Sequence, residues 1–327
     1  MMTSESIRER VYEFQKIRVI LTGYELGVFT ALREGGMTSE EVSRELKTDP
    51  RATDRLMNAL TAMKFLQKEN GLFRDTPESS EFLVRGKPGY MAGLMHAVHL
   101  WDTWSTLTEA VRKGTSIAAR RDVNERGGNW LEAFIDAMHY RASRQAPALV
   151  GAIDLDGVAN VLDLGGGSGA FAMAFAAARP GISAVVFDLP NVIPLTKMYI
   201  EKANLGSLVR TAVGDYTKDD IGKGFDIVFL SAIIHSNGVE ENRALVLKCA
   251  GALKGGGRVI IQDHIMDSDR TNPPGGAIFA LNMLVGTKSG DTYTENEVGE
   301  WMRNAGLSGI TRTETPFGYS QMSGRKP

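Results

Sequence analysis

The sequence has little cysteine, no surplus of charge of one sign and no long apolar run. Cys249 is the only cysteine among 327 residues, which excludes an internal disulfide and a metal site built from several thiolates. The 37 basic and 39 acidic side chains nearly balance, so no general attraction for nucleic acid or an anionic membrane is expected. No stretch approaches the roughly 18 consecutive apolar residues of a membrane-spanning helix. We expect a cytoplasmic protein with neither nucleic acid nor membrane as a partner.

Histidine is also scarce, with five in the chain, and this bears on metal binding. His96 and His99 lie three residues apart on an expected helix, where they could share a metal ion. No third ligand of matching spacing follows, and a catalytic zinc ion usually takes three protein ligands. We therefore predict no metal site and assign both histidines to the core or to an interface.

The first third of the chain predicts a winged helix. Helical spacing of apolar residues over 17–32 is followed by "MTSEEVSREL", with a capping box at Thr38, and by "DPRATDRLMNALTAM", with Pro50 at the first helical position. Asn70-Gly71 between apolar pairs then predicts a tight hairpin. A winged helix often binds DNA, but residues 36–85 carry eight basic and nine acidic side chains. We interpret the domain as a packing or dimerisation module.

From residue 160 onward, short apolar runs such as "VLDL" and "DIVFL" alternate with helical stretches such as "AFAMAFAAAR". This alternation predicts an α/β domain whose parallel sheet is covered by helices on both faces. Ligands of such sheets bind at the carboxyl ends of the strands. We divide the chain into a winged-helix domain at 1–100, a helical connector at 101–153 and the α/β domain at 154–327.

The first strand runs into a glycine-rich loop, "VLDLGGGSGAFA". Gly165 and Gly167 let the backbone approach a ligand closely, and this loop also fits the dinucleotide pattern of NAD enzymes. Asp163 favours another ligand, because its carboxylate would repel a pyrophosphate but suits the ammonium and sulfonium groups of S-adenosylmethionine (SAM). Asp188 and Asp215 follow the next two strands, where they can meet the ribose hydroxyls and the adenine amino group. We therefore predict SAM rather than NAD.

These motifs together resemble the two-domain, SAM-dependent O-methyltransferases of small molecules, which include plant caffeate and flavonoid enzymes, acetylserotonin methyltransferase and bacterial relatives. "TSEEVSREL" and "RLMNALTAMKFL" match the family's winged helix, "FIDAMHYRAS" matches the helix that enters the catalytic domain, and "VLDLGGGSG", "FDLP" and "GDY" are its cofactor motifs in order. The resemblance covers nearly the whole chain. It implies a Rossmann-like class I methyltransferase domain after a winged-helix domain that pairs two subunits into a homodimer.

The resemblance also implies a set of site residues. SAM, with S-adenosylhomocysteine (SAH) as its product, would be held by the motif residues at the strand ends. The acceptor pocket would be lined from "FIDAM" and "LNMLV". The expected cofactor-binding residues are Asp163, Gly165, Gly167, Asp188, Leu189, Asp215, Tyr216 and Ser231, and the expected acceptor-binding residues are Phe134, Met138, Asn282 and Met283.

The segment "SAIIHSNG" aligns with the part of the family that carries the catalytic base, which His235 matches. From the sequence alone, this histidine could equally close the strand end with a backbone hydrogen bond. Of the two acids that orient the base in plant members, Asp263 matches one, whereas Thr292 replaces the other beside Asp291. Plant members also have aspartate and lysine where this chain has Ser236 and Ser231. We predict His235 and Asp263 as the catalytic residues.

The predicted function is methyl transfer from SAM to a hydroxyl of a small aromatic or enolic metabolite, with His235 as general base. Transfer to carbon or nitrogen of a polycyclic or tetrapyrrole-like substrate is an alternative that the missing second acid suits. A SAM-binding protein with chemistry other than methylation, a dehydrogenase and a non-enzymatic winged-helix regulator are the more distant readings. The sequence does not name the acceptor molecule.

Overall fold

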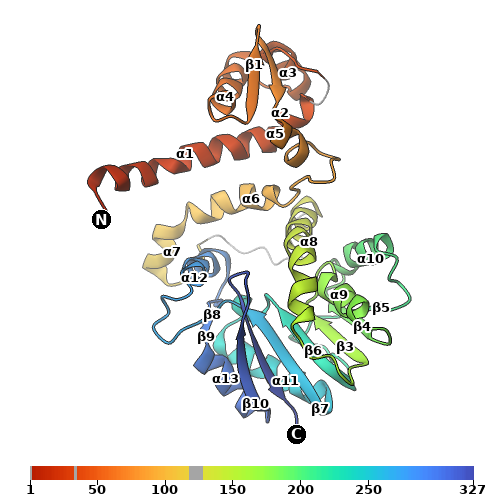
Figure 1. Cartoon of the computed structure of the whole chain (residues 1–327). Helices are drawn as coiled ribbons and strands as arrows, with labels where there is room; N and C mark the ends of the chain where they lie inside the picture. The colour runs from red at the N-terminus through yellow and green to blue at the C-terminus, as the bar shows by residue number, and fades with distance from the viewer. Residues whose placement is uncertain (1, 33–34, 118–127) are drawn as a thin grey trace. The chain divides into compact units, whose positions relative to one another are not determined.

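The computed structural model describes residues 2–32, 35–117 and 128–327, and it divides into two compact units, Met1–Trp101 and Asp102–Pro327 (Figure 1). Among the helices of the described residues, none has both the length and the apolar character needed to span a membrane.

The N-terminal unit contains the predicted helices and hairpin. Its elements are α1 (Ser4–Leu26), α2 (Val28–Ala31), α3 (Ser39–Leu46), α4 (Pro50–Ala62), β1 (Leu66–Glu69), β2 (Leu72–Asp75), α5 (Pro77–Phe82) and most of α6 (Leu94–Trp104). The predicted capping box is present, because Thr38 Oγ1 accepts from the Glu41 amide while Glu41 accepts from the Thr38 amide. The turn between the antiparallel β1 and β2 passes through Asn70 and Gly71, both at positive φ, as a tight hairpin needs.

The core of the N-terminal unit lies between its helices and its hairpin. Phe29 of α2, Leu60 of α4 and Phe73 of β2 are at most 1% exposed and belong to one apolar cluster. Burial of such side chains contributes roughly 1.5–3 kcal/mol each to folding. The wing of the winged helix is therefore part of this core and not only an exposed ribbon.

The C-terminal unit is built around a seven-stranded sheet with the order β10-β11-β7-β6-β3-β4-β5. The strands are β3 (Asn160–Leu164), β4 (Ser183–Asp188), β5 (Val209–Val213), β6 (Phe225–Ser231), β7 (Leu253–Asp263), β10 (Ser308–Glu314) and β11 (Ser320–Arg325). Strands β3 to β7 pair in parallel, whereas β11 and β10 are antiparallel additions at one edge. The strand order reverses at β3, and this switch point is where open α/β sheets bind their ligands.

Helices cover both faces of the sheet, as predicted (Figure 1). One apolar cluster joins the sheet to α8 (Gly128–Gly151), α9 (Ala170–Ala178) and α10 (Ile193–Lys202), and the other joins it to α11 (Val239–Ala252) and α13 (Glu295–Asn304). The remaining elements are α7 (Leu107–Lys113), the short 3-10 helix η1 (Ile234–Ser236), α12 (Pro274–Gly286) and the two-residue strands β8 (Ile265–Met266) and β9 (Tyr293–Thr294). This layered α/β sheet is the fold that the alternating pattern predicts.

Candidate active site

The predicted catalytic pair, His235 and Asp263, comes together at the carboxyl edge of the sheet. β6 leads into η1, which carries His235, and β7 ends at Asp263. His235 Nδ1 lies 2.8 Å from Asp263 Oδ1 and 3.0 Å from Oδ2. Asp263 is 1% exposed and the His235 side chain is 12% exposed. The Asp263 carboxylate therefore holds the imidazole of His235. A histidine that only closed the strand end with a backbone hydrogen bond would lack this contact.

Local structure explains why His235 sits where it does. The chain leaves β6 through Ala232, which has a φ of +58°, a strained conformation that is found at functional sites more often than elsewhere. The fully buried Asn242 of α11 then donates to the carbonyl of Ile234 at 2.8 Å. These two features hold the single turn of η1 and, with it, the imidazole.

The surroundings of Asp263 decide its charge. Burial by itself raises a carboxyl pKa, but the charge and hydrogen bond of His235, together with the His264 amide at 2.8 Å, hold the pKa of Asp263 below its ordinary value. An ionised carboxylate accepts hydrogen bonds only, so the proton of a neutral imidazole lies on Nδ1. Nε2 of His235 then carries a free lone pair and can accept a proton.

The glycine-rich loop between β3 and α9 has the backbone that a cradle for a ligand requires. Gly165 and Gly167 have φ values of +66° and +56°, which residues with a Cβ rarely adopt. A Cβ on Gly165 would collide with Ile233, the neighbour of η1. The loop is tied to α8 by Ser168 Oγ, which lies 2.9 Å from His139 Nδ1.

Two predicted cofactor residues lie against this loop, but their surroundings differ. Asp188 Oδ2 accepts from the Gly167 amide and Oδ1 accepts from the Leu189 amide, both at 2.7 Å, and burial raises the pKa of this carboxyl. Asp163 is 1% exposed and accepts from the Ala172 amide at 3.0 Å. Burial raises the pKa of Asp163 to about 7. Asp163 therefore lies beneath the loop, where it supports the first turn of α9.

The other predicted cofactor residues lie at the ends of β5 and β6. Asp215 Oδ1 accepts from the Thr217 amide at 2.9 Å, and the Tyr216 hydroxyl donates to Asn237 at 3.3 Å. Ser231 Oγ accepts from Gln262 Nε2 at 3.0 Å. All of these residues lie on the carboxyl side of the parallel strands, as does the catalytic pair.

The residues predicted to line the acceptor pocket lie on two helices. Phe134 and Met138 are on α8, whereas Asn282 and Met283 are on α12. Asn282 Oδ1 accepts from the Trp104 indole at 2.9 Å. Met283 is 7% exposed and belongs to the interior of the unit, so little of its side chain is available to a ligand.

Sequence reasoning missed Phe279, which packs directly on the catalytic pair. Its ring is 4.8 Å from the His235 ring in an edge-to-face arrangement and 4.6 Å from the His264 ring. A signal was available, because Phe279 lies one helical turn before Asn282 and Met283 and so shares their face of α12. The second imidazole, His264, has no such signal in the sequence.

The structure answers the question that Thr292 and Asp291 raised. Asp291 lies 3.4 Å from Arg270 and accepts from its neighbouring amide, whereas Thr292 is 3% exposed. Arg270 also donates to the Thr292 carbonyl at 2.8 Å. Asp291 therefore forms part of an ion-pair network with Arg270, and Asp263 is the acid that contacts His235.

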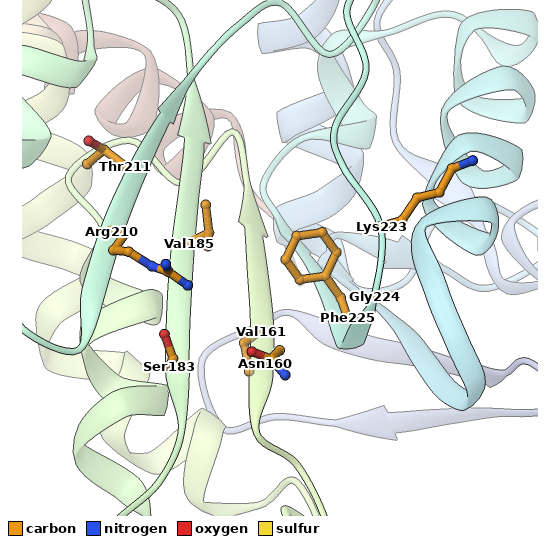
Figure 2. A pocket seen from close by; sticks show the side chains of 9 residues that line it. All are labelled: Asn160, Val161, Ser183, Val185, Arg210, Thr211, Lys223, Gly224 and Phe225. Carbon is orange, nitrogen blue, oxygen red and sulfur yellow. The ribbon is translucent and has the colours of Figure 1, made fainter.

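A pocket of about 460 Å³ lies at the opposite edge of the sheet, where the strands begin (Figure 2). Figure 2 shows Phe225, Val185 and Arg210 around it, together with Asn160 and Ser183 at the starts of β3 and β4. None of its lining residues belongs to the predicted site. Within the described part of the chain, no group of three or more metal-ligating side chains is present.

Comparison with known proteins identifies the family. The family model described as the O-methyltransferase domain matches residues 104–308, and that of the O-methyltransferase dimerisation domain matches residues 10–85. The chain belongs to the O-methyltransferase family. It is a SAM-dependent enzyme, and the predicted fold class and family are confirmed.

The relatives of this O-methyltransferase include two enzymes of Streptomyces. It is 32% identical to 3-hydroxy-5-methyl-1-naphthoate 3-O-methyltransferase of Streptomyces sahachiroi over 90% of this chain and 87% of the relative. It is 29% identical to the tetracenomycin polyketide synthesis 8-O-methyl transferase TcmO of Streptomyces glaucescens over 96% and 94% of the two chains. The solved structure of human N-acetylserotonin methyltransferase in complex with SAM matches with a TM-score of 0.83, 24% identity and coverage of 100% and 99%, which shows the shared fold.

Proposed function

We propose that this O-methyltransferase transfers the methyl group to a hydroxyl of a polycyclic aromatic metabolite, with His235 as the general base. The pairing of His235 with the buried, ionised Asp263 carries this proposal. An imidazole with a carboxylate on Nδ1 has the correct tautomer for accepting a proton on Nε2, and the resulting imidazolium is stabilised.

Proton transfer from the acceptor hydroxyl to the base has a free-energy cost. A phenol has a pKa of about 10 and a free imidazole one of about 6.5, so proton transfer between them costs roughly 5 kcal/mol. The Asp263 charge, 2.8 Å from Nδ1, favours the imidazolium and lowers this cost. Because Asp263 stays buried, the attraction acts in a medium less polar than water.

The cofactor fits the residues that are present. When bound, SAM supplies a methyl group on a positively charged sulfur, which leaves as neutral SAH. Gly165 and Gly167 offer a loop without Cβ atoms at the switch point of the sheet. Asp188 would hold the ribose, with Leu189, Asp215, Tyr216 and Ser231 around the remainder, while Asp163 keeps the loop in place.

The acceptor class is inferred from the walls of the site and from the relatives. Phe134, Met138 and Phe279 would present flat or flexible apolar surfaces to an aromatic ring. Two relatives are named for a naphthoate and for a tetracenomycin polyketide. A fused aromatic acceptor with a phenolic hydroxyl is the class that both considerations favour.

Methyl transfer from labelled SAM to a panel of hydroxylated naphthalenes and tetracyclic phenols tests the function. His235→Ala should lower kcat roughly 10²–10⁴-fold while SAH binding, measured by calorimetry, stays within a factor of about three of the wild-type value. A variant that keeps most of its turnover would refute the assignment of the base. Leu247→Ala, at a position of α11 that is 59% exposed, serves as a control with no expected effect on the chemistry.

We also propose that two copies pair through the N-terminal unit. Ile7, Val11 and Phe14 lie on one face of α1 and are about half exposed, at 50%, 61% and 49%. Such an apolar stripe usually marks an interface. Val11→Lys should convert a dimer into a monomer in light scattering, whereas Arg8→Ala, on an exposed part of α1, should not. A wild-type monomer at micromolar concentration would exclude the proposal.

A further inference from the structure

Arg141 is a half-buried cation that contacts Tyr319 and Met138, and it forms no salt bridge with any acid of the described residues. It lies on α8, one turn after Met138. Its Nη1 donates to the Tyr319 hydroxyl at 2.7 Å and its Nη2 contacts Met138 Sδ at 3.3 Å. In the described parts of the chain it forms no salt bridge, unlike most other part-buried arginines such as Arg312, which has three. A guanidinium has five N–H donors, so most of its donor capacity is unused.

His264, which contacts the Tyr319 ring, also has a polar atom without a hydrogen-bond partner among the described residues. Its Nδ1 is buried and has no hydrogen-bond partner among the described residues. Burial, the largest influence, lowers the pKa of this imidazole, whereas a hydrogen bond to the Gly318 backbone raises it. Donation from Nδ1 to a ligand would use the single N–H proton of the neutral ring, which the Gly318 contact otherwise takes up. A buried polar atom without a partner costs roughly 1–3 kcal/mol, which is a reason to expect a ligand there.

A continuous row of rings links Arg141 to the base. The Tyr319 ring lies under the guanidinium at 5.5 Å and 4.6 Å from the His264 ring. His264 lies 4.6 Å from Phe279, which in turn lies 4.8 Å from His235. The unused donors therefore belong to the same wall of the unit as the proton acceptor.

The acid of this wall, Asp263, is already engaged by other groups. Asp263 is the acid next to His264, but both of its oxygens are engaged by His235 and one also accepts from the His264 amide. Among the described residues, Arg141 therefore has no carboxylate in direct contact with its guanidinium, and a carboxylate on a ligand could take that place. A planar guanidinium matches a carboxylate in geometry, because two parallel N–H groups can meet its two oxygens.

We infer that Arg141 and His264 bind a carboxylate on the acceptor molecule while the acceptor's hydroxyl faces His235. The inference rests on the proposed function and narrows its substrate class from hydroxylated aromatics to hydroxylated aromatic acids. Arg141 would donate two hydrogen bonds to the carboxylate and His264 would donate one from Nδ1. The Tyr319 hydroxyl would keep the guanidinium in place.

A matched set of acceptors tests the inference: 3-hydroxy-2-naphthoic acid, 3-hydroxy-1-naphthoic acid, their carboxamides and 2-naphthol. For at least one acid, wild-type kcat/KM should exceed that of its carboxamide by about 10–100-fold, the range expected for a charged hydrogen-bonded pair. Arg141→Met should remove this preference by weakening the acid alone, and Arg141→Lys should keep part of it. His264→Phe, which preserves the ring packing, should raise KM for the acid several-fold.

The control lies on the same helix. Arg144 is exposed and stacks on Tyr140 at 3.5 Å, so Arg144→Met removes the same charge from α8 without touching the row of rings. It should leave the preference for acids unchanged. If Arg141→Met lowers kcat/KM equally for the acid, the amide and 2-naphthol, Arg141 is only a structural link between α8 and Tyr319, and the inference is wrong.

Binding to the SAH-loaded enzyme separates this inference from the proposed function. Calorimetry with the naphthoic acids requires no turnover, and it should show affinity that depends on Arg141 even if none of these compounds is methylated. Absence of turnover with all hydroxylated aromatics would count against the proposed function. Equal affinity of the acid for wild type and Arg141→Met would count against the carboxylate site.

Discussion

Each of the two units buries a carboxyl group at the last residue of a β-strand, and the surroundings shift the pKa values of the two groups in opposite directions. Asp75 ends β2 in the N-terminal unit, and neither of its oxygens has a hydrogen-bond partner among the described residues. Burial raises the pKa of Asp75 to about 7. Asp263 ends β7, is more deeply buried, and yet has a pKa below the ordinary value because of His235 and neighbouring amides.

The difference shows that burial alone does not decide the charge of an acid. Desolvation pushes both groups toward the neutral form. Of the two acids, only Asp263 has an imidazole and a backbone amide placed where they stabilise the ionised carboxylate. A charged acid in the interior is therefore a property of the site in the C-terminal unit, whereas Asp75 is expected to hold a proton up to about pH 7.

The largest expected effect follows from removing the charge of Asp263. In Asp263→Asn the amide group can donate to Nδ1 of His235, which moves the imidazole proton to Nε2 and blocks the base. Turnover should fall roughly 10²–10⁴-fold, measured as kcat with labelled SAM. Asp75→Asn is the matched control and should leave kcat unchanged. Equal losses in the two variants would mean that the effect is one of folding.

Removing the imidazole should make Asp263 resemble Asp75. In His235→Leu the carboxyl stays buried without its main partner, so its pKa should rise above the unfolded value. Its contribution to stability is then lost as the pH rises through that raised pKa, whereas the wild-type pair keeps its contribution above about pH 4. The variant should be about 3–5 kcal/mol less stable than wild type at pH 8 and much closer to it at pH 4. Urea unfolding at the two pH values measures this, and a deficit independent of pH would exclude the explanation.

The sequence predicts the fold because local patterns agree with it. The Thr38 capping box, the Asn70-Gly71 turn and the alternating apolar runs each specify an element without reference to distant residues, and all are present. The site is predictable only where the family motif or a strand end indicates a residue, as for His235 and Asp263. Phe279 lies on α12, Arg141 on α8 and His264 between β7 and β8, and their contacts depend on side-chain packing that residue spacing does not describe.

The role of Asp163 illustrates the same limit. An acid before the glycine loop suggests a contact with the positive charges of SAM, because the sequence gives its charge but not its direction. In the structure its carboxylate accepts from the Ala172 amide beneath the loop and is 1% exposed. Whether a strand-end acid faces a ligand or a helix depends on the loop's backbone, which the glycines leave undetermined in the sequence.

A smaller effect, on the pH dependence of stability, is expected from substituting Asp75. The folded-state pKa of Asp75, about 7, lies above the unfolded value, so its contribution to stability is present at low pH and is lost as the pH rises through 7. The asparagine in Asp75→Asn does not titrate, so the variant should lack this part of the pH dependence of the free energy of unfolding. Thermal unfolding between pH 5 and 8.5 should show a flatter profile for the variant than for wild type. Parallel profiles would mean that Asp75 is solvated and ionised in the folded protein.

The smallest effect is expected at Asp163, and Asp188 provides the matched comparison. Asp163→Asn keeps an oxygen that can accept from the Ala172 amide and removes a charge that the pKa of about 7 already leaves half neutral at that pH. SAH affinity, measured by calorimetry at pH 7, should change by less than about threefold. Asp188→Asn loses one of two backbone hydrogen bonds and the proposed ribose contact, so affinity should fall by about 10–100-fold. If Asp163→Asn weakened SAH binding as strongly as Asp188→Asn, the Asp163 carboxylate would have to reach the cofactor, and its place beneath the loop would change on binding.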